Sequence, residues 1–311
     1  MDLVLVNPNS ADETYQDLAK NYSAIETPTW CLLLANAVRK KNFKVKIIDC
    51  DAEKLSAYDF SKRVIDLNPK LVLFVVYGQQ PNAGTTNMIG AYKEARELKR
   101  LEKKLKICFV GSHTSALPKE VLKNEFVDIV LLNEGVYALL NLLGINDLED
   151  LSSIKGIGFK KRNKNIIDLI LNTPEQVVPQ SKMDEDLPGY AWDLLPYDKK
   201  PLDLYRAHFW HANFDHNQRT PFAAIYTSLG CQFACDFCMI NILNRTDNSD
   251  DISSADSKGM RFWSPEFIIN EFEKLHQLGV RTLRISDEMF FLNRKYYEPL
   301  LNEIIKRKYK F

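Results

Sequence analysis

The sequence predicts an α/β protein in which a doubly wound parallel sheet is followed by the first part of a parallel (β/α) barrel. Three observations lead to this prediction. Short apolar segments alternate with amphipathic stretches from residue 1 to about residue 143, as expected for strands covered by helices on both faces. A hairpin pattern and a proline-punctuated segment come next. From residue 222 onward, strand and helix patterns alternate again around a cysteine-rich loop.

The first domain is expected to contain a five-stranded sheet. Its strands are predicted at residues 3–6, 45–48, 71–76, 107–110 and 129–132, with a helix over 86–103. Thr27 is predicted to cap another helix that starts with Pro28 and continues through Trp30 and Leu33. In such sheets ligands lie outside the carboxyl ends of the strands. The loops to examine are therefore 7–14, 77–86, 111–115 and 133–135.

A change in the spacing of the apolar residues separates this domain from the rest of the chain. Residues 154–171 read as a β-hairpin with a polar turn at 162–165. Prolines at positions 174, 179, 188, 196 and 201 then interrupt a segment without sustained periodicity. The predicted division is a doubly wound domain at 1–145, a hairpin and linker at 146–221, and a partial barrel at 222–311.

The last part of the chain reads as two βα units. A strand is predicted at 222–227, and Ser264 with Pro265 behind it opens a helix that Gly279 ends. A second strand at 282–285 leads to Ser286, Asp287 and Glu288, and a second helix is predicted at 296–308. A complete eight-fold barrel takes about 200 residues, so we expect a truncated, partial or split barrel.

Composition excludes several classes of protein. The 41 basic and 41 acidic residues give a net charge of 0, which argues against a nucleic-acid partner. No apolar run approaches the roughly 20 residues needed to cross a membrane, and the amino terminus lacks a basic leader, so a cytoplasmic location is expected. Cys31, Cys50 and Cys108 stand alone in helix or strand patterns and are expected to be small buried apolar residues.

Three further cysteines crowd into one loop directly after a predicted strand. Cys231, Cys235 and Cys238 are separated by three and then two residues. A closed structural zinc site needs four ligands, so this set leaves one metal position open. The alternative is a zinc ion whose fourth ligand is one of the histidines at positions 208, 211 and 216. Either way, the loop predicts a metal site rather than disulfides.

The cysteine spacing, with Phe237 just before the last cysteine, resembles the signature of the radical S-adenosylmethionine (radical SAM) superfamily. The resemblance implies that Cys231, Cys235 and Cys238 hold a [4Fe-4S] cluster whose fourth iron binds S-adenosylmethionine. One electron from the cluster then cleaves the cofactor to a 5′-deoxyadenosyl radical. It further implies that Ser286, Asp287 and Glu288 contact the cofactor. The alternative for Asp287 and Glu288 is a solvated strand end or a helix cap.

The order of the predicted domains resembles the cobalamin-binding class of this superfamily. Supporting residues in the first domain are Asn7-Pro8, the segment from Gly111 to Ser115, and Asn133-Glu134-Gly135. Relatives typically carry Gly-Glu-Gly-Glu at the last place, and two of those positions differ here. No Asp-x-His-x-x-Gly sequence follows the first strand, so the usual lower cobalt ligand is missing.

The same resemblance suggests that a corrinoid would meet Gly78, Thr85, Thr86, Gly111, His113, Glu134 and Gly135. The alternative for the residues of the 77–86 loop is that they are ordinary loop residues of a flavodoxin-like sheet. The alternative for His113 is a structural hydrogen-bonding role.

The implied activity is that of a cobalamin-dependent radical SAM enzyme that methylates an unactivated carbon of a small-molecule substrate. A reducing partner such as flavodoxin or ferredoxin would supply electrons. No residue is assigned the substrate chemistry. The aromatic segment 205–214 either lines a pocket between the domains or packs the linker against them. The alternatives are a radical SAM cyclase or rearrangement enzyme, a ligand-binding protein with a zinc-stabilised cysteine loop, and an inactive truncated product.

Overall fold

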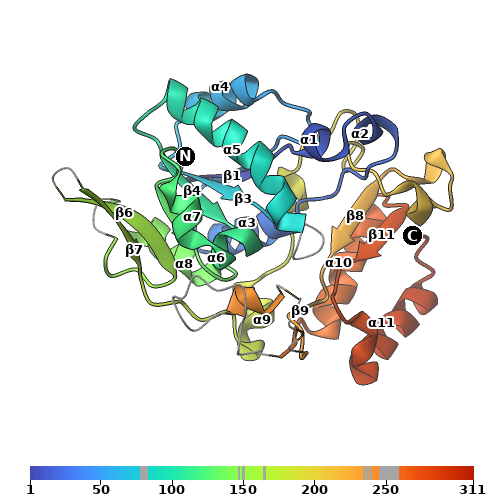
Figure 1. Cartoon of the computed structure of the whole chain (residues 1–311). Helices are drawn as coiled ribbons and strands as arrows, with labels where there is room; N and C mark the ends of the chain where they lie inside the picture. Colours follow the sequence, from blue (N-terminus) through green and yellow to red (C-terminus); the bar gives the residue numbers. More distant parts are fainter. Residues whose placement is uncertain are drawn as a thin grey trace.

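The computed structural model describes residues 1–77, 83–145, 148, 151–163, 166–233, 235, 238, 240–244 and 259–311. Within these ranges, no helix combines the length and apolar character that a membrane crossing requires. The two parts of the chain that the sequence predicts are visible in Figure 1, with the large sheet on one side and the strands β8 and β11 on the other.

A seven-stranded sheet forms the centre of the first part. The strand order is β2-β1-β3-β4-β5-β6-β7, and the first five run parallel. The strands are β1 (Leu3–Asn7), β2 (Val45–Asp49), β3 (Leu71–Val75), β4 (Lys106–Val110), β5 (Ile129–Leu131), β6 (Ile157–Asn163) and β7 (Ile166–Leu171). The five predicted parallel strands are confirmed. The predicted hairpin also forms, but it continues the sheet antiparallel to β5, so the expected count of five strands was too small.

Helices cover both faces of the sheet. One face carries α3 (Thr29–Lys40) and α8 (Val136–Gly144), and the other carries α4 (Ala57–Leu67), α5 (Ala83–Leu101) and α7 (Pro118–Lys123). Successive residues of β1 pack into opposite cores, since Leu3 and Leu5 face α3 while Val4 and Val6 face α4 and α5. The fold is therefore doubly wound, as predicted.

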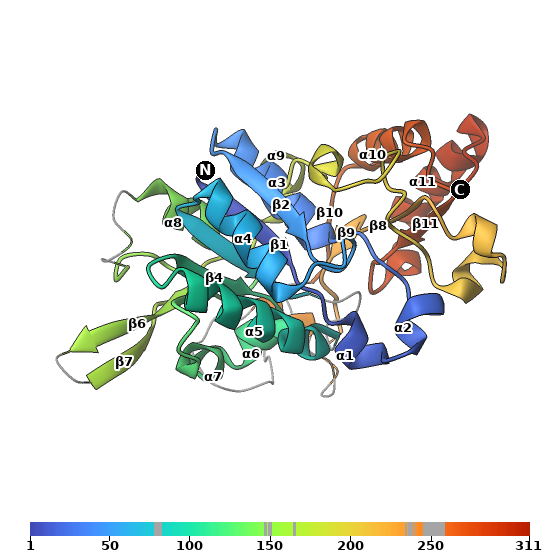
Figure 2. The ribbon, with the colours of Figure 1, turned by 90° about the horizontal axis from the view of Figure 1, so that it is seen from above.

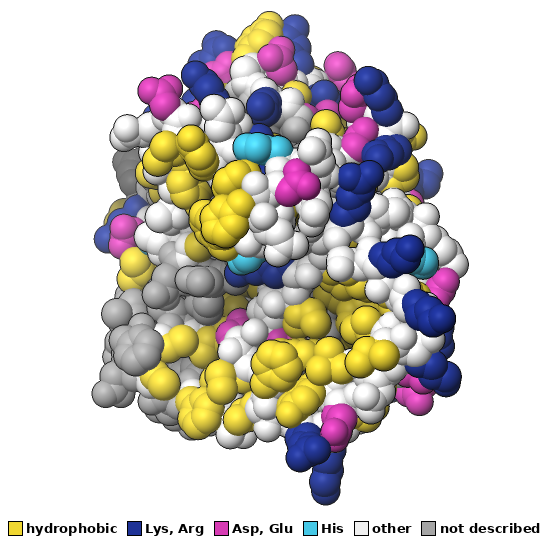
Figure 3. Space-filling view, turned by 90° about the vertical axis from the view of Figure 1, so that its right-hand side faces the viewer, with side chains coloured by type: hydrophobic (Ala, Val, Ile, Leu, Met, Phe, Trp, Pro, Cys, Tyr) yellow, Lys and Arg dark blue, Asp and Glu magenta, His cyan; other side chains and the backbone are white. Residues whose placement is uncertain are grey.

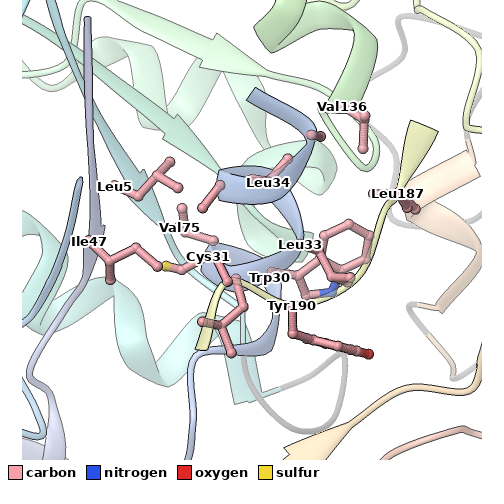
Figure 4. Packing of buried hydrophobic residues seen from close by; sticks show 14 of the residues in the cluster. Leu5, Trp30, Cys31, Leu33, Leu34, Ile47, Val75, Val136, Leu187 and Tyr190 are labelled. Atoms are coloured by element: carbon pink, nitrogen blue, oxygen red, sulfur yellow. The ribbon is translucent and has the colours of Figure 1, made fainter. Parts of the chain in front are cut away.

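Helix α3 is the central packing element of one face. Figure 4 shows Cys31 and Leu34 of α3 directed toward the sheet and Trp30 and Leu33 on the side of Tyr190. The helix thus fills the space between the sheet and the linker. Cys31, Cys50 and Cys108 are all free and buried, which confirms their prediction as small buried residues.

Shorter elements occupy the loops at the carboxyl edge of the sheet. They are α1 (Ala11–Tyr15), α2 (Leu18–Asn21) and α6 (Ser112–Ala116). The segment predicted as a loop at 111–115 is therefore mostly helical. Gly111 precedes α6 with a φ of 148°, which lets the chain turn directly from β4 into the helix.

The linker has little regular structure, as its prolines predict. It contains one short helix and four 3₁₀ turns, namely α9 (Met183–Asp186), η1 (Gln180–Lys182), η2 (Trp192–Leu194), η3 (Phe209–Ala212) and η4 (His216–Gln218). Figure 2 shows the linker running between the large sheet and the last part of the chain.

The last part of the chain contains two βα units, as predicted. Its elements are β8 (Phe222–Ile225), β9 (Ser228–Leu229), η5 (Ile240–Asn244), β10 (Arg261–Phe262), α10 (Pro265–Gln277), β11 (Thr282–Ile285), η6 (Phe290–Leu292) and α11 (Arg294–Arg307). Strands β8 and β11 pair parallel, and β9 pairs antiparallel with β10. Ser264 caps α10 by accepting a hydrogen bond from the Phe267 amide at 3.2 Å, which confirms that prediction.

Two side chains from outside the partial barrel form hydrogen bonds with backbone groups at the edge of β8 that does not pair with β11. The Thr27 hydroxyl accepts a hydrogen bond from the Ala224 amide at 2.9 Å and donates to its carbonyl at 3.3 Å. The Tyr190 hydroxyl does the same for the amide and carbonyl of Tyr226, both at 2.8 Å. Thr27 therefore does not cap α3 as predicted, because its hydroxyl is used by β8; Pro28 precedes the helix instead.

Candidate functional site

The carboxyl ends of the parallel strands face the second part of the chain, and a large cavity lies there. Its volume is about 450 Å³. Asn7 and Pro8 line it from the end of β1, and Val75 and Tyr77 line it from the end of β3. These strands are neighbours in the sheet whose helices leave toward opposite faces, which is the topological switch point where doubly wound folds bind ligands.

A second, smaller cavity lies between the two parts of the chain. It measures about 30 Å³ and is lined by Glu134 from the first part and by Tyr226, Gly230 and Glu288 from the second. Trp30 and Tyr77 line both cavities, and their rings stack with centroids 4.8 Å apart. We call this pair of rings, Trp30 and Tyr77, the aromatic partition.

The predicted corrinoid-binding residues after β3 and β4 come together in part. The Thr85 hydroxyl lies 3.2 Å from Nδ1 of His113, so these two residues form a contact across the edge of the sheet. Burial lowers the pKa of His113, which keeps the ring neutral at physiological pH. Thr86 lines the large cavity, while its hydroxyl donates to the Ala83 carbonyl at 2.8 Å. Gly78 lies outside the described residues.

Two of the predicted glycines, Gly111 and Gly135, lie where the fold leaves no room for a side chain. A Cβ at Gly111 would lie 2.1 Å from the Val76 carbonyl oxygen, so β3 and β4 approach too closely there for a side chain. Gly135 adopts a φ of 73° before α8, and a Cβ there would lie 2.8 Å from a methyl group of Val110. Both observations account for the residue type through the fold, and a corrinoid contact of either glycine remains a prediction.

Glu134 has a partner that the sequence did not predict. Its carboxylate receives two hydrogen bonds from the Arg261 guanidinium, and both side chains are only 5% exposed. Arg261 also donates to the Val178 carbonyl at 2.7 Å. Arg261 belongs to β10, which follows the cysteine loop, so the ion pair fastens that loop to the carboxyl edge of the large sheet.

The cysteine loop begins where predicted, immediately after β9. Cys231 is buried, Cys238 is half-buried and Cys235 is exposed. The Cys238 amide donates to the Cys235 carbonyl at 3.0 Å, and the Phe233 amide donates to Sγ of Cys231 at 3.5 Å. Phe237 lies outside the described residues. Over the described part of the chain, no three His, Cys, Asp or Glu side chains are arranged to hold a metal ion, so the ligand assignment stays a prediction.

The three residues after β11 have distinct surroundings. The Asp287 carboxylate accepts hydrogen bonds from the Thr227 amide, the Thr227 hydroxyl and the Ser228 hydroxyl, each at 2.6 Å. It thereby fixes the turn that leads from β8 into the cysteine loop. Burial raises the pKa of Asp287, although these hydrogen bonds oppose the shift. The Ser286 amide donates to the Ile225 carbonyl at 2.7 Å.

Glu288 is the residue of this group that faces the small cavity. Burial, with a smaller contribution from the neighbouring charge of Asp287, raises the pKa of Glu288 to about 7. The side chain can therefore hold or release a proton near neutral pH. A direct contact of Ser286, Asp287 or Glu288 with a cofactor remains a prediction.

The predicted aromatic linker segment lines the large cavity. His208, Trp210 and His211 all contribute to its wall, so the interpretation of this segment as pocket-lining is supported. Figure 3, which faces the right-hand side of Figure 1, shows a hollow with hydrophobic side chains along its lower wall and a histidine and basic side chains above it.

Sequence reasoning missed several residues of this region. Glu26 and Arg284 form an ion pair at 2.8 Å on the wall of the large cavity, and neither was singled out. The two are far apart in sequence, and no local pattern joins them. Trp30 was recognised only as a helix residue, although it also forms half of the aromatic partition.

Three comparisons with known proteins bear on these observations. A family model described as "B12 binding domain" matches residues 15–143. An uncharacterized methyltransferase of Pyrococcus horikoshii is 27% identical over 271 residues, which cover 86% of this chain and 50% of the relative. The chain therefore spans about half the length of this curated relative.

Solved structures share the fold across nearly the whole chain. One of them is the radical S-adenosylmethionine methyltransferase TsrM of Kitasatospora setae, with cobalamin and a [4Fe-4S] cluster bound. It superposes on this chain with a TM-score of 0.64 and a sequence identity of 16%, and the match covers 99% of this chain and 53% of TsrM. Another is the cobalamin-dependent S-adenosylmethionine radical enzyme OxsB, with aqua-cobalamin and S-adenosylmethionine bound. Its TM-score is 0.63 and its sequence identity is 17%, and the match covers 99% of this chain and 37% of OxsB. Residues 15–143 thus match the B12-binding domain family, and the chain as a whole shares its fold with about half of TsrM.

Proposed function

We propose that this protein, whose residues 15–143 form a B12-binding domain, acts as a cobalamin-dependent radical SAM methyltransferase. One observation carries the proposal most directly. The carboxyl edge of the B12-binding domain and the carboxyl ends of β8 and β11 line one common cavity, with the cysteine loop fastened beside it through Glu134 and Arg261. Two cofactors that must react with each other would meet at this place.

The residues present fit the cofactors that the proposal requires. Cys231, Cys235 and Cys238 offer three thiolates, which suits a [4Fe-4S] cluster that keeps one iron open for S-adenosylmethionine. At the edge of the sheet, the hydroxyl group of Thr114 is buried and finds no hydrogen-bond partner in the part of the chain that the structure describes. When bound, the cluster would supply the electron for reductive cleavage of S-adenosylmethionine, and the cobalamin would carry the methyl group.

The chain's own residues would position these groups. Asp287 holds the turn before the cysteine loop through Thr227 and Ser228. Glu288, whose pKa burial raises to about 7, can accept or donate a proton in the small cavity. Thr85, Thr86 and His113 would form the edge on which the corrinoid rests, with Gly111, Glu134 and Gly135 beside them.

The finer parts of the proposal follow from the activity itself. The methyl acceptor is an unactivated carbon of a small-molecule substrate, and a reducing partner such as flavodoxin or ferredoxin supplies the electron. Ser286, Asp287 and Glu288 contribute to the S-adenosylmethionine site together with Phe237.

The cysteine assignment is tested with Cys235→Ala, and Cys108→Val serves as a control at a buried cysteine outside the loop. Each protein is reconstituted with iron and sulfide without oxygen, and iron, acid-labile sulfide and the spectrum of the reduced cluster are measured. We expect Cys235→Ala to lose the cluster and Cys108→Val to keep it. An unchanged iron and sulfide load in Cys235→Ala would contradict the assignment.

The corrinoid edge is tested independently with Thr85→Trp, which places a bulky ring beside His113. Thr173→Trp introduces the same ring at an exposed position after β7. The proteins are incubated with hydroxocobalamin and passed through gel filtration. We expect the wild type and Thr173→Trp to retain cobalt and Thr85→Trp to lose most of it. Equal retention by both variants would place the corrinoid elsewhere.

A further inference from the structure

The large cavity combines aromatic rings with carboxylates on its wall. Tyr15, Tyr77 and Trp210 contribute rings, and Glu26 and Asp51 contribute carboxylates. Its volume of about 450 Å³ is within the range of small-molecule sites. Aromatic faces and carboxylates are the groups that attract organic cations in proteins.

The basic side chain of this wall is already neutralised. Arg284 is the sole Lys or Arg among the described residues that line the cavity, and its guanidinium lies 2.8 Å from Glu26. The two form an ion pair in which each charge compensates the other. An anionic ligand would have to compete with Glu26 for Arg284.

Asp51 carries the uncompensated carboxylate. It follows β2 and is half-buried, and the structure gives its oxygens no hydrogen bond or ion pair with any described residue. Burial, strengthened by the charge of Asp49, raises the pKa of Asp51 to about 7. The nearest opposing guanidinium, that of Arg206, is engaged by backbone carbonyls of residues 19, 20 and 23.

The two histidines of the wall add no positive charge at neutral pH. Burial and the neighbouring charges of His211, Arg284 and Arg219 lower the pKa of His208 to about 4. Burial and Arg284 also lower the pKa of His211. The His208 ring stacks on Trp210 with centroids 4.4 Å apart, which holds the indole at the wall. At pH 7.5, above the raised pKa of Asp51, the described lining therefore has an excess of negative charge beside exposed aromatic faces.

We propose that this cavity binds the protonated amino group of an organic amine, with Asp51 as its carboxylate partner and Trp210 and Tyr15 as its aromatic neighbours. The proposal rests on the proposed function in one respect: since the cavity adjoins the edge where the cofactors would meet, the bound amine is the substrate class of the methyl transfer. Binding itself requires neither cofactor, so it can be tested on the protein without them.

The test compares three probes of one shape by calorimetry at pH 7.5. They are 2-phenylethylamine, the neutral 2-phenylethanol and the anionic 3-phenylpropionate. We expect the wild type to bind the amine at least about tenfold more tightly than either of the other two. Equal affinity for the amine and the alcohol would overturn the proposal.

Variants assign the effect to Asp51. Asp51→Asn keeps the shape of the side chain and is expected to lower amine affinity about tenfold while leaving the alcohol unaffected. Asp66→Asn, at an exposed position of α4, serves as the matched control. Trp210→Leu provides a second variant at the mouth of the cavity and should weaken amine binding several-fold. Wild-type affinity in Asp51→Asn would contradict the assignment.

One more arm separates this inference from the proposed function. The amine titration is repeated with saturating hydroxocobalamin. Retained amine binding supports a substrate site, whereas competitive loss would show that the cavity belongs to the corrinoid and would overturn the proposal. Failure of the protein to hold iron or cobalt would overturn the proposed function and leave amine binding unaffected.

Discussion

Asp287 shows how a single carboxylate can organise the site through hydrogen bonds to a neighbouring turn. Its three hydrogen bonds to Thr227 and Ser228 join the end of β11 to the turn after β8. A motif after a barrel strand predicted a cofactor contact, and the structure gives the same residue a positioning role. The adjacent Glu288 is the one whose side chain reaches the cavity.

Replacing Asp287 by Asn should destabilise the protein. Both hydroxyl groups donate to Oδ2, and an amide nitrogen at that place could not accept from them. We expect the free energy of unfolding to fall by about 1–3 kcal/mol, measured by urea denaturation. The exposed Asp66→Asn is the control. Unchanged stability of Asp287→Asn would contradict the role of these hydrogen bonds.

The burial of Glu94 leads to a prediction about how the stability of the protein depends on pH. Glu94 is almost fully buried, its Oε1 accepts from the Asn9 amide at 3.0 Å, and its Oε2 has no hydrogen-bond partner among the described residues. Burial raises the pKa of Glu94 from 4.5 to about 8. The folded protein therefore holds this proton more tightly than the unfolded chain does. The resulting stability is fully present below pH 4.5 and is lost as the pH rises to about 8.

Substituting Glu94 by Gln removes this titration while keeping an acceptor for Asn9. The difference in unfolding free energy between Glu94→Gln and wild type should grow in favour of the variant between pH 5 and pH 8, by a few kcal/mol at most, since one pKa unit corresponds to about 1.4 kcal/mol. Glu97→Gln, about one turn further along α5 and half-buried, should run parallel to the wild type over this range, because the hydrogen bond from Arg100 lowers the pKa of Glu97. If the unfolding free energies of Glu94→Gln and wild type differed by the same amount at every pH, the prediction would be refuted.

At the level of strands and helices, local signals predicted most of the fold. Apolar runs located all five parallel strands, and the Ser264-Pro265 start and Gly279 end bounded α10 closely. The hairpin was recognised, but its place in the sheet depends on pairing with β5, which no local pattern encodes. Helix α4 went unassigned although Ser56 caps it.

Thr27 illustrates what local signals cannot supply. A threonine before a proline favours a helix cap, yet its hydroxyl bonds both backbone groups of Ala224, nearly two hundred positions away. The competing partner exists only once the two domains are together. Edge strands need such cover because unpaired backbone groups are costly to bury.

Thr27→Val tests this cover of the β8 edge. The methyl group keeps the shape of the side chain but leaves the buried amide and carbonyl of Ala224 without partners. We expect a loss of about 1–3 kcal/mol in unfolding free energy, and faster hydrogen exchange of the Ala224 amide. Thr86→Val, whose hydroxyl bonds within its own helix end, is the comparison. Protection of Ala224 equal to wild type would contradict the account.

The two domains are joined by contacts between residues distant in sequence. Glu134 and Arg261 pair across the junction, and Tyr190 and Thr27 bind β8. These contacts determine where the cysteine loop sits relative to the B12-binding domain. The sequence predicted each domain and the residues of the site separately, and only the structure shows which of them meet.

The buried ion pair allows a test of this junction. Arg261→Met leaves the Glu134 carboxylate buried without its partner and should cost about 3–5 kcal/mol. The double variant Glu134→Gln with Arg261→Met removes that charge and should recover part of the loss. Urea denaturation measures both, and proteolysis of the linker reports whether the domains separate. A double variant no more stable than Arg261→Met would argue against a paired role.

The central claim is that one chain brings a cobalamin and an iron–sulfur cluster together. It is tested most directly by measuring iron, acid-labile sulfide, zinc and cobalt in protein purified without oxygen and reconstituted with iron, sulfide and hydroxocobalamin. We predict about four irons and four sulfides per chain, with cobalt retained after gel filtration. Stoichiometric zinc without sulfide or cobalt would contradict the account and favour a zinc-stabilised binding protein.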